Sequence, residues 1–268
     1  MNYGKKSVKQ KKKALQSTSS KLGRKCLLTF SKVLLLCVIA IGIIGICAGL
    51  GVFKGIIDSA PTITLEDATP TRYSSFIYDS KGNQMAKLIA EDSNRVPVTM
   101  DQIPTDLANA FVAIEDERFY QHNGIDIMGI LRAGVTAVKT GFKRQEGAST
   151  ITQQLIKNTV LTTWTQEKTL GERIKRKVQE QYLAIQLEKD TNDKSKILEQ
   201  YMNTINLGQN TLGVQAASKR YFNKNVWELS LSECATIAGI TQNPSRFNPL
   251  SENGRKRNEE KRRVILQY

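Results

Sequence analysis

The sequence predicts a mainly α-helical domain with a small β-hairpin region, preceded by one transmembrane helix. Three observations support this prediction. Residues 33–53 form a run of 21 residues without a charge, which is long enough to span a bilayer as a helix. Residues 76–89 contain two β-rich runs around a turn. After residue 104, apolar residues recur at helical spacing up to the end of the chain.

The N-terminal segment is strongly basic. Residues 1–25 hold nine lysines and arginines and no acid, so they supply +9 of the formal net charge of +14. A basic run alone could bind nucleic acid, but this one abuts the uncharged run, so no nucleic-acid partner is expected. The positive-inside rule predicts a cytoplasmic tail at 1–32, a signal-anchor at 33–53 and an exported remainder. A cleaved signal peptide would have a shorter apolar core.

The exported part is predicted to begin with a linker at 54–73, which is polar and contains two prolines, and to continue as one domain at 74–268. Only Cys234 lies after the anchor, so no disulfide framework and no cysteine metal site is expected there. The domain starts with the extended pair, whose runs at 76–78 and 85–89 flank a turn. Helices are then predicted at 107–115, 151–160, 170–187, 197–205, 213–222 and 232–240.

Two segments have less certain roles. Residues 126–147 are apolar with interspersed basic side chains, which fits either an ordinary core helix followed by a loop or an interfacial element that dips into the outer leaflet. The last residues begin a helical run that reaches Tyr268 with neither a cap nor a glycine. We therefore expect the chain to be the front part of a longer protein.

The stretch 113–126, AIEDERFYQHNGID, carries an acid pair, two aromatic residues and the only histidine of the chain. Leu107, Phe111 and Glu115 fall on one face at helical spacing. Glu115 therefore shares the apolar face, where a carboxylate is partly desolvated and takes up a proton more readily at neutral pH. The alternative is a helix-end acid that pairs with Arg118.

Residues 146–158, EGASTITQQLIKN, carry three hydroxyls and two amides within six residues after a glycine. Such groups in the first turn of a helix suit an anion or a sugar, because the free backbone amides and the helix dipole point the same way. Lys157 lies one to two turns further on, near enough to assist. The alternative is plain N-capping by Ser149 or Thr150.

Two further stretches are ordinary when taken singly. Glu180 follows Arg176 in a helix and lies off its apolar stripe, so a salt bridge on a solvated face, worth roughly 0.2–0.5 kcal/mol, would give the same pattern. Residues 194–203 form a helix with apolar residues facing inward. The apolar stripe of the helix that contains Glu180 consists of Leu170, Ile174, Val178, Tyr182 and Ile185.

Taken in order, four blocks closely resemble the glycosyltransferase domain of peptidoglycan polymerases. These are the family-51 transglycosylases, found alone or as the front half of class A penicillin-binding proteins. The family patterns EDxxFxxHxG, GxSTITQQ, RKxxE and KxxILExYxN match residues 115–124, 147–154, 176–180 and 194–203, and 220–249 match as well. The resemblance implies a two-lobed, lysozyme-like fold with a membrane-embedded jaw, to which residues 126–135 correspond.

The resemblance also implies an activity. The enzyme would polymerise lipid II onto a growing lipid-linked glycan by inverting transfer, with β-1,4 linkage and release of polyprenyl pyrophosphate. Glu115 would be the base, and Glu180 would hold a divalent cation, Mg²⁺ or Mn²⁺, with no organic cofactor. Expected partners are the membrane and other cell-wall synthesis proteins. The expected substrate contacts are Asp116, Phe119, His122, Arg132, Ser149, Thr150, Gln153, Gln154, Lys157, Arg176, Lys177 and Asn203.

Some positions depart from the family pattern. The fifth block, RxxxVLxxM, has Lys261 and Ile265 here, and the chain ends before the methionine. Lysine keeps the charge of arginine but loses its planar fork. The segment before the third block is longer than usual, which leaves open whether Lys168 or Arg173 contacts phosphate. The alternative functions are a lysozyme-like glycan hydrolase and an inactive membrane-anchored scaffold. The basic residues argue against the hydrolase, because finished glycan carries no pyrophosphate.

Overall fold

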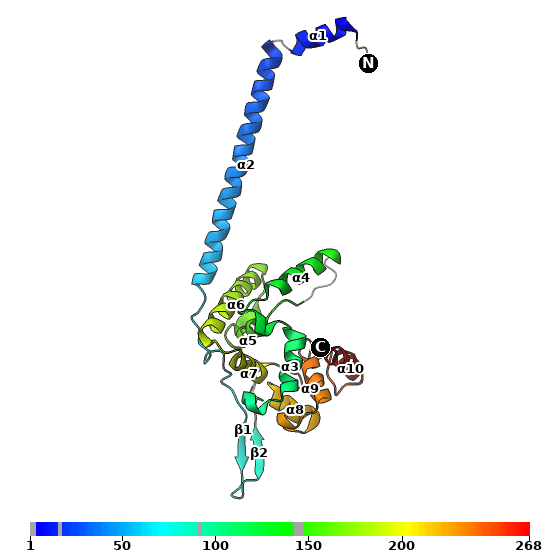
Figure 1. The fold of residues 1–268 in the computed structure, drawn as a ribbon. Helices are drawn as coiled ribbons and strands as arrows, with labels where there is room; N and C mark the ends of the chain where they lie inside the picture. The colour runs from blue at the N-terminus through cyan, green and yellow to red at the C-terminus, as the bar shows by residue number, and fades with distance from the viewer. Residues whose placement is uncertain (1–3, 16–17, 91–92, 142–146) are drawn as a thin grey trace. The chain divides into compact units, whose positions relative to one another are not determined.

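A computed structural model describes residues 4–15, 18–90, 93–141 and 147–268 (Figure 1). Small parts of the predicted tail, 1–3 and 16–17, and the end of the predicted interfacial segment, 142–146, lie outside the described residues. The chain divides into two compact units, Met1–Asp58 and Ser59–Tyr268.

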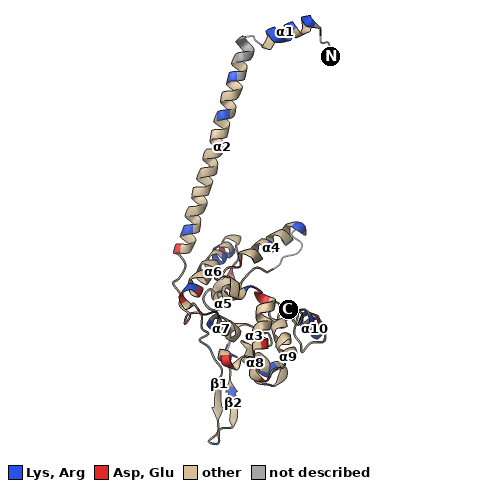
Figure 2. Cartoon of the chain, viewed as in Figure 1, with Lys and Arg blue, Asp and Glu red and all other residues tan. Residues whose placement is uncertain are grey.

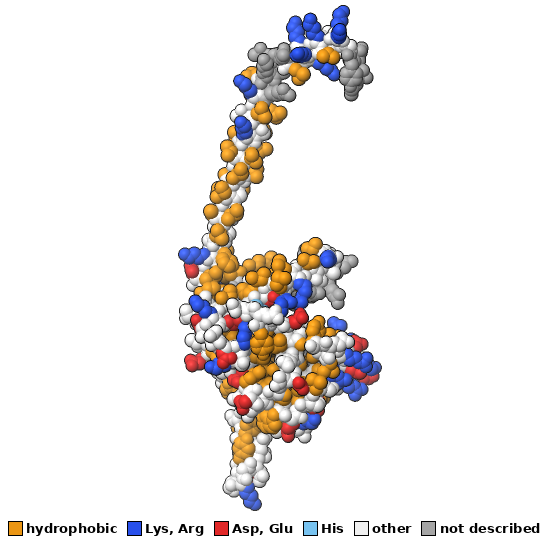
Figure 3. All heavy atoms as spheres, in the orientation of Figure 1, with side chains coloured by type: hydrophobic (Ala, Val, Ile, Leu, Met, Phe, Trp, Pro, Cys, Tyr) orange, Lys and Arg blue, Asp and Glu red, His pale blue; other side chains and the backbone are white. Residues whose placement is uncertain are grey.

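The first unit consists of helix α1 (Lys5–Leu15) and helix α2 (Thr18–Asp58). Helix α1 is rich in lysine, whereas the middle of α2 carries no charge (Figure 2). The part of α2 from Lys25 to Asp58 is long and apolar enough to cross a membrane, and its hydrophobic side chains are exposed (Figure 3). The helix continues past residue 53, so residues 54–58, which we predicted as linker, are helical. The first helix-breaking proline is Pro61.

The second unit is helical apart from one hairpin. Its longer elements are β1 (Ser75–Tyr78), β2 (Gln84–Leu88), α3 (Thr105–Glu115), α4 (Ile127–Lys139), α5 (Ile151–Thr159), α6 (Leu170–Thr191), α7 (Lys194–Thr204), α8 (Val214–Phe222), α9 (Leu231–Ile240) and α10 (Glu252–Ile265). Short 3₁₀ turns lie at η1 (Met100–Gln102), η2 (Phe119–Gln121), η3 (Thr162–Gln166) and η4 (Val226–Glu228). The mainly helical fold, the hairpin and the N-terminal apolar helix are thus confirmed. The likeness to lysozyme stays a prediction.

The hairpin β1–β2 is antiparallel, and its turn is stabilised by Asp79. The Asp79 carboxylate accepts hydrogen bonds from the backbone amides of Lys81 and Asn83, both at 2.8 Å. Gly82 has a φ of +82°, a left-handed conformation that glycine adopts without a steric cost. The turn residues DSKGN therefore act as the sequence predicted.

The core is built by helices that are distant in sequence. Helix α3 packs on α9, α9 packs on α10, and α5 packs between α6 and α7. The rings of Phe111 from α3 and Tyr201 from α7 meet edge to face, with their centroids 5.9 Å apart, an arrangement that aromatic pairs prefer. Ile63 and Ala68 are buried in the same core. Part of the predicted linker therefore belongs to the domain.

Helix α4 is not an ordinary core helix. Gly129 is its one buried residue among those described, and its apolar side chains are exposed (Figure 3). An amphipathic helix normally turns its apolar side inward. The core-helix interpretation of this segment is therefore wrong. The exposed apolar residues are Ile127, Met128, Ile130, Leu131, Val135 and Val138.

Candidate active site

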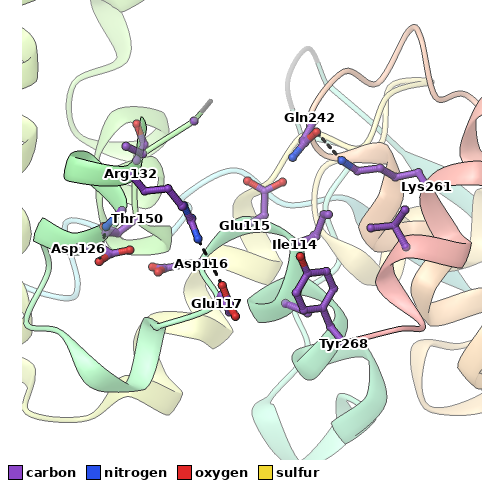
Figure 4. Close-up of a pocket in the computed structure, with 16 residues that line it drawn as sticks. Ile114, Glu115, Asp116, Glu117, Asp126, Arg132, Thr150, Gln242, Lys261 and Tyr268 are labelled. Carbon is purple, nitrogen blue, oxygen red and sulfur yellow. Dashed lines mark hydrogen bonds and ion pairs between the residues drawn. The ribbon is translucent and has the colours of Figure 1, made fainter. Parts of the chain in front are cut away.

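A cleft of about 530 Å³ opens at the end of α3 (Figure 4). Its walls are the C-terminus of α3, the first turns of α4, the segment before α5, and helix α10 with the residues that follow it. All four segments include residues that the sequence singled out, among them Lys261 of the fifth block. The lining side chains of most chemical interest are Glu115, Asp116, Glu117, Asp126, Arg132, Ser149, Thr150, Gln242 and Lys261.

Glu115 is the last residue of α3, and hydrogen bonds hold both of its carboxylate oxygens. Gln154 Nε2 donates to Oε2 at 2.8 Å, and Thr241 Oγ1 donates to Oε1. The hydroxyl of Tyr201 lies 3.4 Å from the Gln154 carbonyl oxygen and donates to it. Gln154, which we predicted to contact substrate, thus orients Glu115 in this structure.

The simple alternative for Glu115, a helix-end pair with Arg118, is not formed. The guanidinium of Arg118 instead binds both oxygens of Asp126, at 3.1 and 2.6 Å. Asp126 is the N-cap of α4 and also accepts from the Gly129 amide at 2.9 Å. These bonds hold the start of α4 and leave Glu115 to Gln154 and Thr241.

A second group of motif residues, which we call the buried interlock, comprises Asp116, His122, Gly124, Thr150 and Gln153. Asp116 is buried and accepts from His122 Nε2 at 2.9 Å. It also accepts from the first backbone amide of α5, that of Ile151, at 3.0 Å. An acid at a helix N-terminus is favoured by the helix dipole. Asp116 therefore fixes α5 against the end of α3.

Gly124 completes the buried interlock. Its carbonyl oxygen accepts from Thr150 Oγ1 at 2.8 Å and from Gln153 Nε2 at 3.1 Å. Its φ is +86°, and a Cβ at this position would lie 2.6 Å from the carbonyl atoms of Ala184 in α6. Only glycine allows this close approach of the backbone. Thr150 is also the N-cap of α5, so the capping alternative holds for this residue.

Four residues that we predicted as substrate contacts lie away from the cleft in this structure. Phe119 is fully buried, and His122 and Gln153 are also buried at the interlock. Asn203 is buried too, and its side chain bonds both the amide and the carbonyl of Val98, at 2.9 and 2.7 Å. Motif spacing in a sequence does not distinguish such buried structural contacts from contact with a ligand.

A cationic cluster, formed by Lys157, Arg176, Lys177 and Glu180, joins α5 to α6. Glu180 is 1% exposed, and its two oxygens contact Arg176 Nη1 and Lys177 Nζ, the latter at 2.6 Å. Lys177 Nζ also donates to Ser149 Oγ at 2.8 Å. The spacing of Arg176 and Glu180 is that of a surface salt bridge, but the burial of Glu180 shows that the solvated-face interpretation is wrong.

Helix α6 is therefore turned differently from what its apolar stripe suggested. The stripe residues Leu170, Ile174 and Ile185 are exposed. The face that contains Glu180 packs inward, where basic side chains neutralise the buried carboxylate. Periodicity alone assigned the wrong face, because it treats a carboxylate as exposed and takes no account of a carboxylate that is buried with basic partners of the same helix.

Lys157 connects this cluster to Glu115. Burial lowers its pKa below the usual value, while the charges of Glu180 and Glu115 raise it and those of Lys177 and Arg176 lower it. Its Nζ lies 4.5 Å from the centroid of the Trp164 ring, a cation–π distance. Lys157 is thus close enough to feel the charges of both carboxylates.

The described residues do not fit the divalent cation that we predicted at Glu180. Both Glu180 oxygens already contact basic nitrogens, and the described residues contain no group of three His, Cys, Asp or Glu side chains able to hold a metal. Mg²⁺ is bound mainly by oxygen ligands such as carboxylates, and a cluster with three basic side chains repels it.

On the opposite wall of the cleft, α10 places Lys261 near Glu115. Lys261 Nζ donates to Gln242 Oε1 at 2.7 Å (Figure 4), and burial lowers the pKa of Lys261, while the charge of Glu115 opposes that effect. Thr241 and Gln242 were not predicted as site residues, although they lie in a stretch whose match to the family we noted. The functional signal of Thr241 is its contact with Glu115, which is 126 residues away in sequence.

The remaining predicted residues are more exposed. Arg132 Nη1 lies 3.6 Å from a Glu117 oxygen at the cleft, and the Arg132 side chain is 54% exposed, so it remains available to a ligand. Lys168 and Arg173 are both exposed.

The sequence was compared with known proteins. A family model described as Transglycosylase matches residues 81–268. Penicillin-binding protein 1A of Clostridium botulinum is 47% identical over 77% of this chain and 24% of its own length. Penicillin-binding protein 1A of Escherichia coli is 41% identical over 82% of this chain and 25% of its own length. The chain therefore spans about a quarter of the length of these relatives.

A crystal structure of penicillin-binding protein 1A from Haemophilus influenzae is 25% identical over 74% of this chain and 18% of its own, with a TM-score of 0.37. That score is too low to support a comparison of folds. The family model, in contrast, covers more than half of the chain and includes all four motifs. The chain therefore belongs to the transglycosylase family, that is, the peptidoglycan glycosyltransferases, and it is related to penicillin-binding protein 1A.

Proposed function

We propose that this chain polymerises lipid II into β-1,4-linked glycan strands, with the growing lipid-linked glycan as donor and polyprenyl pyrophosphate as leaving group. Membership of the transglycosylase family supports this proposal. The observation that carries it is the hydrogen bond from Lys177 Nζ to Ser149 Oγ, because Ser149 lines the same cleft as Glu115. The cations suited to phosphate thus adjoin the cleft that contains the candidate base, and the charge of Lys157 interacts with both Glu115 and Glu180.

In the proposed reaction, Glu115 removes the proton from the 4-hydroxyl of the acceptor. The hydroxyl oxygen bonds to the anomeric carbon of the donor, from the face opposite the pyrophosphate, while the bond from that carbon to the pyrophosphate oxygen breaks. This geometry inverts the configuration. A positioned base of this kind contributes about 10²- to 10⁴-fold to the rate.

Pyrophosphate is a good leaving group and needs its negative charge stabilised more than it needs a proton. Arg176 and Lys177 lie beside Lys157, and all three present N–H donors. Arg176 offers a planar fork that matches phosphate, whereas a lysine acts as a point charge. We assign leaving-group stabilisation to these three side chains, with Arg132 as a further exposed contact.

No step is assigned to a divalent cation, because the Glu180 oxygens are occupied by basic nitrogens. The cationic cluster argues against the hydrolase, because a hydrolase of finished glycan meets no pyrophosphate. The hydrogen bonds that orient Glu115 argue against an inactive scaffold.

We further propose that α2 anchors the chain as a single span, with the basic tail in the cytoplasm and the catalytic unit outside. The exposed apolar residues of α4 would enter the outer leaflet, where the polyprenyl chain of the substrate resides. Other cell-wall synthesis proteins are expected as partners.

The test is a polymerisation assay. Detergent-solubilised protein is incubated with labelled lipid II, with Mg²⁺ and with chelator in parallel, and products are sized beside those of Glu115→Gln. We expect long, lysozyme-sensitive polymer from the parent and a rate at least about 100-fold lower from the variant. Cleavage of preformed glycan without polymer would support the hydrolase, and inactivity of the folded parent in both assays would support a scaffold.

A further inference from the structure

Thr241 directly follows α9, and its hydroxyl faces two acceptors. One is Glu115 Oε1, and the other is the backbone carbonyl oxygen of Ala238, at 3.0 Å. A hydroxyl carries a single proton, so it donates to one acceptor at a time. The turn at the end of α9 therefore gives this hydroxyl two alternative hydrogen bonds, one of which involves the candidate base.

Three elements place charged or titratable groups near Glu115. Lys157 from α5 and Lys261 from α10 are close enough to interact with its charge. Tyr201 from α7 is fully buried, and its pKa is raised well above the usual value by burial and by the charges of Glu115 and Asp116. The second oxygen of Glu115 is held by the neutral Gln154. Only Oε1 has a donor that can turn to another acceptor.

We propose that Thr241 is a positioning residue for Glu115, an inference that rests on the proposed function. Its hydroxyl donates to Oε1 while the carboxylate is ionised, and it turns to the Ala238 carbonyl when Oε1 takes the proton of the acceptor sugar. The proton of the acceptor moves to Glu115, and the proton of Thr241 stays on Thr241.

This alternation has two chemical consequences. Before the proton transfer, the hydrogen bond from the Thr241 hydroxyl stabilises the ionised form of the Glu115 carboxylate, as hydrogen bonds to charged groups do. When Glu115 is protonated, the Thr241 hydroxyl still has an acceptor, the backbone carbonyl oxygen of Ala238. Gln154 cannot do this, because its amide is held by Tyr201 on its other side.

The test compares the parent with Thr241→Val, which removes the hydroxyl at nearly constant volume, and Thr241→Ser, which keeps it. The rate of lipid II polymerisation is measured across a pH series. We expect the acid limb of kcat/KM to move to higher pH in Thr241→Val, with a loss of about tenfold on that limb. KM should change little, and Thr241→Ser should restore the profile of the parent.

Thr236→Val is the matched control. Thr236 lies on the same helix, and its hydroxyl donates to the Ser232 carbonyl at 2.7 Å, outside the cleft. Its variant should keep the pH profile of the parent. If Thr241→Val does not fold, Thr241→Ala removes the same hydroxyl and replaces it in the test.

An acid limb that does not move in folded Thr241→Val or Thr241→Ala would overturn the inference, as would a failure of Thr241→Ser to restore the profile. A carbon NMR titration of the labelled Glu115 carboxyl, with and without the Thr241 hydroxyl, gives a readout that needs no turnover. If the parent makes no polymer, the proposed function fails. The titration then still decides whether Thr241 stabilises the ionised carboxylate, and a midpoint equal in both proteins would overturn that role.

Discussion

The buried interlock and the cationic cluster both include a residue of α5 and both reach the segment just before it, yet they use different interactions. In the interlock, the acid Asp116 accepts a hydrogen bond from the N-terminus of α5, and the neutral side chains of Thr150 and Gln153 donate to the backbone carbonyl of Gly124. The cluster gathers three basic side chains around Glu180. The interlock comes from the first two family motifs, whereas the cluster comes from the third motif together with Lys157.

The comparison teaches that the family motifs include both residues that build the site and residues that act in it. In the interlock every side chain is buried, and the polar atoms face protein partners, with His122 Nδ1 the exception among the described residues. In the cluster the positive charge exceeds the negative charge. That excess has no structural benefit of its own, since like charges repel. We therefore expect substitutions in the two groups to affect different measurements.

The largest effect is expected from Arg176→Gln. It should lower the polymerisation rate by about 100-fold, as removal of one charge-stabilising donor typically does. It should also destabilise the protein by about 2–3 kcal/mol, because Glu180 stays buried with only Lys177 as partner and Glu167 loses its ion pair with Arg176. In the double variant Arg176→Gln with Glu180→Gln, the part of this loss that comes from Glu180 should be recovered, whereas the part that comes from Glu167 should remain. The polymerisation rate should remain low, because the cation is still missing.

Urea unfolding and initial rates of lipid II consumption would measure both quantities. The matched control is the exposed pair of Arg263 and Glu259 in α10, which has the same i, i+4 spacing. Its substitutions should change stability by less than about 1 kcal/mol. A double variant that regained activity together with stability would show that the cluster is only structural, and the contrast between the two regions would be lost.

The interlock is tested by Gly124→Ala. The new Cβ would meet the Ala184 carbonyl at 2.6 Å, in a backbone conformation with φ of +86°. The left-handed conformation and the overlap together should cost about 2–4 kcal/mol. Thermal unfolding should show a Tm lower by roughly 5–15 °C.

Gly134→Ala is the control for this change. A Cβ at Gly134 meets nothing within 4 Å, and alanine favours a helix more than glycine does. This variant should be as stable as the parent or slightly more stable. If Gly124→Ala were as stable as the control, the close packing of the interlock against α6 would be refuted.

Much of the fold could be predicted from the sequence because local signals govern it. Helical spacing, the turn at Asp79 and the uncharged run each act over a few residues, and the helices that they predicted are present. The face of α6 could not be predicted, because the burial of Glu180 depends on its basic partners and on packing against α5. Motif spacing found Glu115 and the cluster. It could not separate Phe119 and Asn203, which are buried, from the residues that reach the cleft.

The contacts of Glu115 could not be predicted from local sequence patterns either. Gln154 was predicted as a substrate contact because its motif carries amides at a helix start, and the structure places its amide on the base. Thr241 comes from the far end of the domain, and no local pattern links it to α3. Residues that act through another side chain leave little periodic or spacing signal, so they had to be found from atomic contacts.

The smallest effect, and the sharpest test of the cluster, is expected from Lys157→Arg. Burial is the main cause that lowers the pKa of Lys157 below 10.5, so this lysine loses its proton at a lower pH than an ordinary one. If its charge stabilises the leaving group, the parent should lose activity as pH rises through that lowered pKa. Arginine stays protonated throughout this range, so the alkaline limb of kcat/KM should move to higher pH, with similar rates near neutrality.

Lys256→Arg on the exposed face of α10 is the control and should leave the pH profile unchanged. An alkaline limb that stays in place in Lys157→Arg would remove Lys157 from the charge balance at the leaving group, and the cluster would then have to work through Arg176 and Lys177 alone.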